Sequence, residues 1–318
     1  MSKDNFYNQL TDFPKQFEWE PKVENKDKLP TTWDSLLICG MGGSALPGLL
    51  LESLMASEKI TVHRDYELPQ NITKKTFVVV ISYSGNTQET ISAYKTAKKQ
   101  NLPLAAVASG GELEKLTQKD KTAYIKVPSE IQPRVALGYQ FMALVELTKA
   151  PKPQNINIDI QKLEQDAKLL AKKINTSIPL FYASTQNKAL AYIAKIQTNE
   201  TAKRHAFYNI FPELNHNELE AWNMEHEAWN MEQFVIIMLK DKSDDKRIVR
   251  KMNLTAKLIE KKGYHVKVVD VSNVNWYNKV IHSVLFTNWL SYYLAIDAGI
   301  DPKPVNLIEE FKGLLRLR

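Results

Sequence analysis

Short apolar runs alternate with segments of helical composition from Leu36 onwards. The runs cover residues 36–40, 60–66, 76–82, 102–109 and 123–128, and helix-compatible segments follow most of them. The central run, FVVVI at 77–81, is long enough for a buried strand and too short for a helix of its own. Strands that alternate with helices are typical of a parallel sheet covered on both faces. The first half of the chain is therefore predicted to be a doubly wound α/β domain.

The second half repeats this alternation after residues 150–159, which contain two prolines and no periodicity and which we interpret as a linker. Strands are predicted at 178–184, 233–241 and 264–271, and helices at 160–174, 187–205, 244–263, 276–298 and 305–317. A chain of 318 residues suits two domains of about 150 residues each. We expect one domain at 1–150, which includes an N-terminal arm at 1–35, and a second α/β domain at 151–318.

The strongest chemical signal is the turn SYSGNT at residues 82–87, directly after the central run. A helix N-terminus offers unpaired N–H groups and a partial positive charge, so a strand that leads into one can bind an anion. The hydroxyls of Ser82, Ser84 and Thr87 can donate to the same anion, and Gly85 lets the backbone approach it. An ordinary N-cap needs only one hydroxyl. We therefore predict phosphate binding here rather than capping alone.

A second candidate is the glycine-rich turn CGMGGSA at residues 39–45. Gly42 and Gly43 let the backbone approach a ligand, and Ser44 begins the next predicted helix. GMGGSA also fits the looser dinucleotide fingerprint, with Asp65 about twenty residues further on, and a tight structural turn explains it equally well. That fingerprint does not require the hydroxyl-rich turn at 82–87. Two such turns on one sheet favour a single small phosphorylated ligand at the carboxyl ends of the strands.

Composition narrows the class of ligand and the cellular compartment. Hydrophobic residues make up 44% of the chain and charged residues 25%, as in globular proteins. The net charge of +6 suits an anionic small substrate and falls short of a nucleic-acid-binding surface. The single cysteine, Cys39, lies in an apolar run and is expected to be buried and reduced. The N-terminus has no apolar signal core and no run reaches membrane-spanning length, so we expect a cytoplasmic protein.

Four further residues could take part in catalysis. Arg134, in IQPRVALG, is the only arginine of the first half after residue 64, and a planar charged donor suits a phosphate or an enediolate. Glu200, late in a predicted helix, and His216, in the loop beyond it, read singly as a surface carboxylate and a loop histidine. Beside a sugar-phosphate pocket, this pair is typical of proton transfer next to a carbonyl. Lys312 is better explained by the polar face of an amphipathic helix.

Five segments, taken in order, resemble one known family. They are CGMGGSAL, VVVISYSGNTQET, PRVALG, AKRHAFYNIFPELNHNE and the C-terminal EEFK. Together they are similar to the bifunctional phosphoglucose/phosphomannose isomerases, which have the sugar isomerase (SIS) domain type. The SYSGNT turn alone indicates only a SIS domain, which enzymes and regulators share, whereas the NHNE block and the order of the segments are specific to this isomerase group. The resemblance covers residues 36–312 and implies two SIS-type domains, each a mostly parallel sheet flanked by helices.

The resemblance also implies a role for each candidate residue. Arg134 matches the arginine that stabilises the enediolate, and Glu200 matches the base that moves a proton between C1 and C2. His216 matches a ring-opening histidine that reaches in from the neighbouring subunit, which implies a homodimer. Lys312 matches a residue that assists ring opening. The residues that match the family's sugar-phosphate cradle are Gly42, Gly43, Ser44, Ser82, Ser84 and Thr87.

The function implied is the interconversion of fructose 6-phosphate with glucose 6-phosphate, and with mannose 6-phosphate, through a cis-enediol. It needs no cofactor, and no metal, because Arg134 supplies the positive charge and no cluster of side chains has ligand spacing. The alternative is a SIS-type sensor that binds a sugar phosphate without catalysis. Such sensors carry an appended DNA-binding domain, for which the first 35 residues are too short. Pentose- and heptose-phosphate isomerases usually have a single SIS domain.

The chain departs from the family pattern in a tandem repeat. EAWNMEH at 220–226 is followed at once by EAWNMEQ at 227–233. Two heptads are too short for a coiled coil. We interpret the repeat as an insertion into a tolerant loop, close enough to His216 to affect the histidine loop or dimer contacts.

Overall fold

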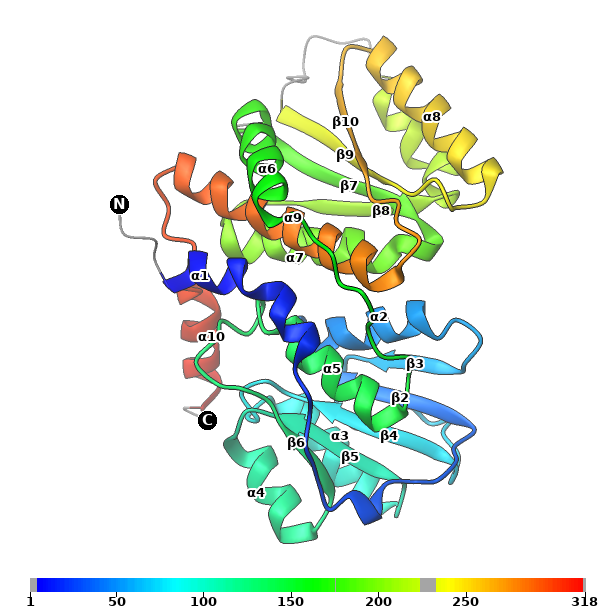
Figure 1. Cartoon of the computed structure of the whole chain (residues 1–318), viewed down its shortest axis with the longest axis vertical. Helices are drawn as coiled ribbons and strands as arrows, with labels where there is room; N and C mark the ends of the chain where they lie inside the picture. Colours follow the sequence, from blue (N-terminus) through cyan, green and yellow to red (C-terminus); the bar gives the residue numbers. More distant parts are fainter. Residues whose placement is uncertain (1–4, 175, 224–232, 317–318) are drawn as a thin grey trace. The chain divides into compact units, whose positions relative to one another are not determined.

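Two compact units, each with its own sheet, make up the computed structural model of the chain (Figure 1). The structure describes residues 5–174, 176–223 and 233–316. The N-terminal unit comprises Thr11–Ile156, and the C-terminal unit comprises Asn157–Arg318 together with residues 1–10. The predicted α/β class with mostly parallel sheets is confirmed. The limits 1–150 and 151–318 stay predictions of the domain boundary, and the division by contacts falls inside the predicted linker.

The N-terminal sheet has six strands in the order β1-β6-β5-β4-β2-β3. Five of them run parallel, and the short β1 pairs with β6 in the antiparallel sense. All residues of β4 and β5 are buried, which explains why these strands are continuous apolar runs rather than alternating ones. The strands are β1 (Val23–Glu24), β2 (Ser35–Gly40), β3 (Ile60–His63), β4 (Thr76–Ile81), β5 (Leu104–Ala108) and β6 (Ala123–Lys126).

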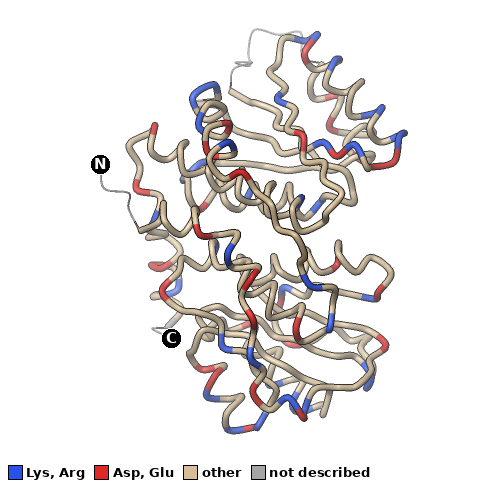
Figure 2. Tube along the Cα trace, in the orientation of Figure 1, with Lys and Arg blue, Asp and Glu red and all other residues tan. Residues whose placement is uncertain are grey.

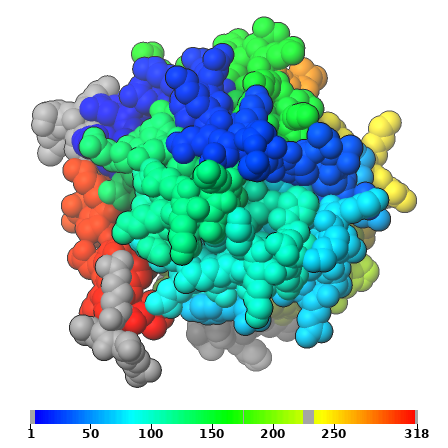
Figure 3. All heavy atoms as spheres, turned by 90° about the horizontal axis from the view of Figure 1, so that it is seen from below, coloured from blue at the N-terminus to red at the C-terminus, as the bar shows by residue number. Residues whose placement is uncertain are grey.

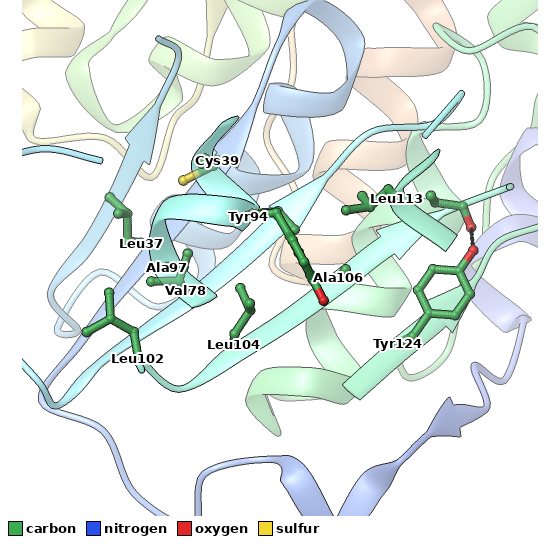
Figure 4. Close-up of a cluster of buried hydrophobic side chains, with 13 residues drawn as sticks. Leu37, Cys39, Val78, Tyr94, Ala97, Leu102, Leu104, Ala106, Leu113 and Tyr124 are labelled. Carbon is green, nitrogen blue, oxygen red and sulfur yellow. Dashed lines mark hydrogen bonds between the residues drawn. The ribbon is translucent and has the colours of Figure 1, made fainter. Parts of the chain in front are cut away.

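Helices cover both faces of this sheet. Leu37 and Val80 lie in the core beneath α3 and α4, which Tyr94 of α3 helps to fill (Figure 4). Ile38 points to the opposite face, where a Cβ at Gly48 of α2 would lie 3.0 Å from its side chain, and α5 packs beside α2. The helices are α2 (Leu46–Leu54), α3 (Gln88–Lys99), α4 (Gly111–Asp120) and α5 (Leu137–Thr148).

The C-terminal sheet has four parallel strands in the order β10-β9-β7-β8. They are β7 (Ile178–Ser184), β8 (Phe207–Phe211), β9 (Phe234–Lys240) and β10 (His265–Asp270). The sequence patterns predict β7, β9 and β10 but not β8. Because β8 is an edge strand, Phe207 and Tyr208 are 51% and 42% exposed, and Asn209 follows them, so neither a buried run nor a strict alternation marks it.

After the linker, the described residues of the C-terminal unit form five α-helices. They are α6 (Ile160–Ile174), α7 (Lys188–Thr201), α8 (Lys246–Lys261), α9 (Trp276–Asp297) and α10 (Asn306–Arg316). On one face of the sheet, Tyr182, Ile236 and Met238 form a core with α8. Among the other helices, α9 packs against both α6 and α7. The predicted helix at 160–174 is confirmed. α7 ends before the predicted residue 205, because Lys203 adopts a left-handed conformation with φ of +53°.

The N-terminal arm divides between the two units. α1 (Asn5–Thr11) packs on the C-terminal unit, where the Tyr7 hydroxyl donates to Glu164 of α6 at 2.9 Å and its ring lies 4.9 Å from that of Trp289. The arm then forms the 3-10 helix η1 (Phe13–Glu18) and β1 on the N-terminal unit, where its blue atoms lie against the cyan and green ones (Figure 3). By contacts, residues 1–10 thus group with the C-terminal unit and the rest of the arm groups with the N-terminal unit, while the predicted domain limits stay predictions.

The tandem repeat is described only in part. Its first copy begins in a 3-10 helix, η6 (Glu218–Trp222), and buries Trp222 against Tyr264 with ring centroids 4.9 Å apart. Residues 224–232, which hold the rest of the first copy and most of the second, lie outside the described residues. The predicted insertion therefore stays a prediction.

Candidate active site

The two predicted phosphate-binding turns leave the N-terminal sheet side by side. β2 and β4 are adjacent parallel strands, and Gly40 at the end of β2 pairs with Ile81 at the end of β4. The next strands in sequence lie on opposite sides of this pair, β3 beside β2 and β5 beside β4, so the chain reverses its direction of progression here. Ligands of open parallel sheets bind outside the carboxyl ends of the strands at such a switch point. The topology therefore favours one ligand shared by both turns.

The first turn packs tightly against the second. It forms the 3-10 helix η3 (Gly42–Ala45), and a Cβ at Gly40 would lie 2.6 Å from the carbonyl oxygen of Ser44. Gly42 has a φ of +51°, a conformation that favours glycine. The N–H of Tyr83 donates to the Ser44 Oγ at 3.0 Å. Ser44 thus joins the two turns, and its own hydroxyl hydrogen can still be donated to a ligand.

The three hydroxyls of the second turn have different surroundings. Ser82 is fully buried, and its Oγ donates to the Thr87 Oγ1 at 2.9 Å. Thr87 is half-buried at the start of α3, and Ser84 is exposed. Ser82 therefore holds the turn in shape, whereas Ser84 and Thr87 are the hydroxyls that a ligand can reach.

The N-terminus of α3, not that of α4, is left for an anion. The first N–H groups of α4 are used within the protein, because Glu112 donates to the Asn86 Oδ1 at 3.0 Å and Leu113 donates to the carbonyl of Gly85 at 2.9 Å. In the described residues, the side chain of the N-cap residue Thr87 accepts no hydrogen bond from the first turn of α3, while the N–H of Thr87 itself donates to the Ser82 Oγ at 3.4 Å. The turn that was weighed as an ordinary N-cap thus leaves these amides available, as a phosphate site requires.

Arg134 lies beside the first turn. A Cβ at Gly43 would lie 3.7 Å from the Arg134 Cα. The arginine is only 3% exposed, and its Nη1 donates to the Gln132 Oε1 at 3.2 Å. A guanidinium keeps its charge when buried, and its field is screened less there than in water. The structure therefore brings Arg134 and both turns together within the N-terminal unit.

The thiol beside this site is unreactive. Burial raises the pKa of Cys39 to about 12, so the sulfur is protonated at neutral pH. The expectation of a buried cysteine is confirmed.

Basic and acidic residues are interspersed over both units (Figure 2).

The other three predicted catalytic residues lie in the C-terminal unit. Glu200 is half-buried in the last turn of α7. His216 is exposed at the end of the 3-10 helix η5 (Glu213–His216). Lys312 is exposed on α10, with its Nζ 2.8 Å from the Glu309 carboxylate. The predicted residues therefore fall into two groups, one in each unit.

The segment that carries His216 is fixed on both sides. Before it, the Asn215 Nδ2 donates at 2.7 Å to the hydroxyl of a threonine in α8. After it, the Glu218 carboxylate accepts hydrogen bonds from the hydroxyl of Tyr182 on β7 and the amide of Asn209 on β8. The imidazole of His216 is therefore exposed on a segment that is held from both sides.

The switch point of the C-terminal sheet is filled by charged side chains of the protein. Asp241, after β9, is fully buried and lies 3.1 Å from Lys279 of α9. Burial acts to raise the pKa of Asp241, but hydrogen bonds from a neighbouring serine and from Lys279 outweigh it and lower the pKa. Ser184, after β7, donates to Asp244 at 2.9 Å, and burial raises the pKa of Asp244. At this switch point the polar side chains bond to one another. The switch point of the N-terminal sheet, in contrast, presents hydroxyls that a ligand can reach.

Sequence reasoning did not single out three residues that organise the site. They are Gln16, Tyr83 and Glu218. Tyr83 and Glu218 lie inside the quoted SYSGNT and NHNE segments, where the neighbouring polar residues drew attention first. Gln16 lies in the arm, and nothing in its local sequence distinguishes it, since its partners are more than a hundred residues away.

In the described part of the chain, none of the helices is both long and apolar enough to cross a membrane. Nor do three or more His, Cys, Asp or Glu side chains of these residues gather as potential metal ligands.

Known proteins resemble the chain in sequence and in fold. The family model for the bacterial phospho-glucose isomerase C-terminal SIS domain matches residues 163–315. A bifunctional phosphoglucose/phosphomannose isomerase of Thermoplasma volcanium is 33% identical over 288 residues, which cover 88% of this chain and 91% of the relative. One of Aquifex aeolicus is 30% identical over 98% of both chains. The crystal structure of tagatose-6-phosphate ketose/aldose isomerase from Escherichia coli has the same fold, with a TM-score of 0.69 at 11% identity over 94% of each chain.

The sequence relatives decide the family. The aligned regions cover 88–98% of this chain and 91–98% of the two relatives. The resemblance drawn from five short segments is thereby confirmed for the chain as a whole. The protein belongs to the family of bifunctional phosphoglucose/phosphomannose isomerases.

Proposed function

We propose that this protein interconverts fructose 6-phosphate with glucose 6-phosphate and with mannose 6-phosphate. The observation that carries the proposal is the pair of turns at the switch point, joined by the hydrogen bond between Tyr83 and Ser44, with the buried Arg134 beside them. This arrangement suits a small phosphorylated ligand that develops a negative charge next to the arginine. Family membership supports an isomerase of hexose 6-phosphates.

The two turns bind the phosphate in this proposal. The backbone N–H groups at Gly42, Gly43 and the start of α3 donate to the phosphate oxygens, together with the hydroxyls of Ser44, Ser84 and Thr87. Ser82 acts through Thr87, because its Oγ donates to that hydroxyl. Phosphate binding supplies energy at a distance from the reacting carbons and holds C1 and C2 in place.

The reaction itself is a proton transfer between neighbouring carbons. His216 and Lys312 open the sugar ring by moving a proton between the ring oxygen and the anomeric hydroxyl. Glu200 removes the proton from C2 of the aldose and returns it to C1, while a proton passes from O2 to O1, so that the aldehyde becomes a ketone through a cis-enediol. Arg134 stabilises the negative oxygen of that intermediate. The scheme uses no metal ion and no cofactor.

The proposal includes a homodimer of two-domain chains. Both units are SIS domains, with limits near 1–150 and 151–318, and each His216 completes the site of the neighbouring subunit. The exposure of His216 on a segment fixed by Asn215 and Glu218 supports this arrangement. A sensor that only binds a sugar phosphate is not favoured, because it has no use for a fixed imidazole.

The test is isomerisation of fructose 6-phosphate by the full chain in the presence of EDTA. Glucose 6-phosphate and mannose 6-phosphate are quantified separately. We expect both products, and no loss of rate when EDTA is added. Formation of glucose 6-phosphate alone would remove the second activity and keep the mechanism. Bound sugar phosphate without turnover would contradict the isomerase and favour the sensor.

A further inference from the structure

The backbone that carries Arg134 is a loop, which by itself would place a long side chain poorly. Residues 127–136 join β6 to α5 without regular structure over most of their length. The loop closes on itself around the arginine, since the N–H groups of Val135 and Ala136 donate to the carbonyl of Gln132 at 2.8 and 3.1 Å. A catalytic group must be held close to its productive position, so something has to fix this loop to the sheet.

Tyr83 fixes the loop before Arg134. Its hydroxyl donates to the carbonyl of Pro128 at 3.0 Å and accepts from the N–H of Ile131 at 3.3 Å. The side chain is 8% exposed. Its main chain belongs to the phosphate-binding turn, where its N–H donates to Ser44. One residue therefore connects the turn that binds the phosphate to the loop that carries the arginine.

Gln16 fixes the same segment after Arg134. Its Nε2 donates to the carbonyl of Val135 at 3.0 Å, and its Oε1 accepts from the N–H of Gly138 at 3.0 Å. The side chain is 3% exposed, and a Cβ at Gly138 would lie only 2.6 Å from it. Gln16 thus acts as the cap of α5 that the sequence of α5 lacks, although it comes from the arm.

We propose that Tyr83 and Gln16 are positioning residues for Arg134, so that the N-terminal arm takes part in the isomerisation. The inference rests on the role given to Arg134 in the proposed function. The two side chains hold the backbone on either side of the arginine, and neither replaces it as the charge that meets the enediolate. Both belong to the N-terminal unit, so the argument holds within one unit.

A purely structural role predicts something different. Buried tyrosine and glutamine side chains that bond to the backbone stabilise a fold wherever they occur. If that were all, their loss would lower the free energy of unfolding and leave the turnover of the folded protein intact. Positioning predicts instead that kcat falls in the folded protein while KM is kept, because the phosphate-binding turns are unchanged.

The first measurement is steady-state kinetics of Tyr83→Phe in the full chain. The substitution removes only the hydroxyl and keeps both main-chain contacts of the turn. We expect kcat to fall about tenfold or more, with KM within about twofold of wild type. Gln16→Met, which keeps the length of the side chain and loses its hydrogen bonds, is expected to act in the same direction. Fluorescence-monitored unfolding shows that each variant is folded at the assay temperature.

Tyr94→Phe is the matched control. It also removes a buried hydroxyl from the N-terminal unit, since the Tyr94 hydroxyl lies 2.8 Å from the hydroxyl of Thr122, which precedes β6, whereas the arginine loop follows the other end of that strand. We expect it to lower the unfolding temperature and leave kcat unchanged. An equal loss of kcat in Tyr94→Phe and Tyr83→Phe would overturn the proposal.

A double-variant cycle separates this inference from the proposed function. Arg134→Lys is expected to lower kcat about 100-fold, and adding Tyr83→Phe is expected to lower it little further, because the second residue acts through the first. Additive losses would show that Tyr83 acts independently of Arg134. Normal kcat in Tyr83→Phe and Gln16→Met beside an inactive Arg134→Lys would overturn the inference and leave the proposed function standing. Full activity of Arg134→Lys would instead contradict the role of the arginine itself.

Discussion

At the scale of single residues, Gly85 is the position where the phosphate-binding turn tolerates no side chain. Its φ is +69°, and a Cβ there would lie 1.8 Å from the carbonyl oxygen of Gly110. Gly42 has a similar φ of +51° but has no atom within 4 Å of such a Cβ. The two glycines therefore separate backbone strain from steric overlap.

Gly85→Ala is predicted to lower the free energy of unfolding by about 3 kcal/mol, because strain and overlap add. Gly42→Ala, with strain alone, should cost about 1–2 kcal/mol. Urea unfolding of both variants measures the difference. Equal losses would mean that the turn moves away from Gly110 without penalty, and that it is less rigid than a phosphate site requires.

Glu200→Gln is predicted to abolish turnover and leave sugar-phosphate binding intact. The amide cannot accept the C2 proton, so kcat should fall by about 1,000-fold, while the phosphate-binding turns lie in the other unit and are untouched. Steady-state rates and calorimetric binding of fructose 6-phosphate check the two halves of the prediction. Substantial residual isomerisation would remove Glu200 from the role of the base.

At the scale of elements, the sequence pattern predicts the buried strands, whereas the elements that depend on tertiary contacts are missed. The strands β2, β4 and β5 are buried on both faces, so their apolar runs predict them well. The sequence also places the two turns correctly, because a strand followed by a helix must turn at the sheet edge. β8 escapes prediction because its residues at the sheet edge are partly exposed, and the local sequence of the arm does not show that the Tyr7 ring of α1 packs against Trp289 of α9.

The ion pair between Asp241 and Lys279 attaches α9 to the end of β9. Both side chains are buried, and removal of one partner leaves a charge without compensation. Lys279→Met is predicted to lower the free energy of unfolding by about 3–5 kcal/mol, measured in urea at pH 7. Asp241→Leu combined with Lys279→Met should cost less than Lys279→Met alone, because neither partner of the pair is then left as an uncompensated charge.

An exposed pair on α6 is the control for this prediction. Lys162 and Asp166 lie 2.9 Å apart with side chains 68% and 47% exposed, so Lys162→Met should change stability little. A comparable loss in both single variants would mean that the buried pair is no more important than a surface one.

The same pair gives a dependence on pH. The folded protein holds the pKa of Asp241 below its ordinary value, so the stability it contributes is present above about pH 4 and is lost as the pH falls through the folded pKa. The raised pKa of Asp244 works in the opposite direction, which makes Lys279→Met the cleaner probe. Its cost should be smaller at pH 3 than at pH 7, because a protonated Asp241 needs no partner.

At the scale of the whole molecule, the candidate site could be predicted residue by residue but not as an arrangement. Residue type and order single out Ser84, Thr87 and Arg134 as candidates, since each of them lies in a short contiguous motif. The contacts that fix them could not be predicted, because Tyr83 contacts residues 128–131 and Gln16 contacts residues 135–138, which are remote from them in sequence. The firm hold on the His216 segment likewise depends on strands and a helix that are remote in sequence.

The proposed homodimer gives the last prediction. Glu200→Gln and His216→Ala should each be inactive alone, because one lacks the base and the other lacks the ring-opening group. If His216 acts on the neighbouring subunit, a mixed dimer has one site that combines an intact Glu200 from one chain with an intact His216 from the other. Random exchange in an equal mixture should then restore about a quarter of the wild-type activity, since half of the dimers are mixed and each has one working site.

The measurement is the isomerisation rate after the two variants are unfolded together and refolded, with size-exclusion chromatography to show that dimers form. Refolding each variant alone is the control, and it should give no activity. Dimers without recovered activity would place His216 in the site of its own chain. Recovery would show that the exposed imidazole of His216, on a segment held by Asn215 and Glu218, completes the active site of the other chain.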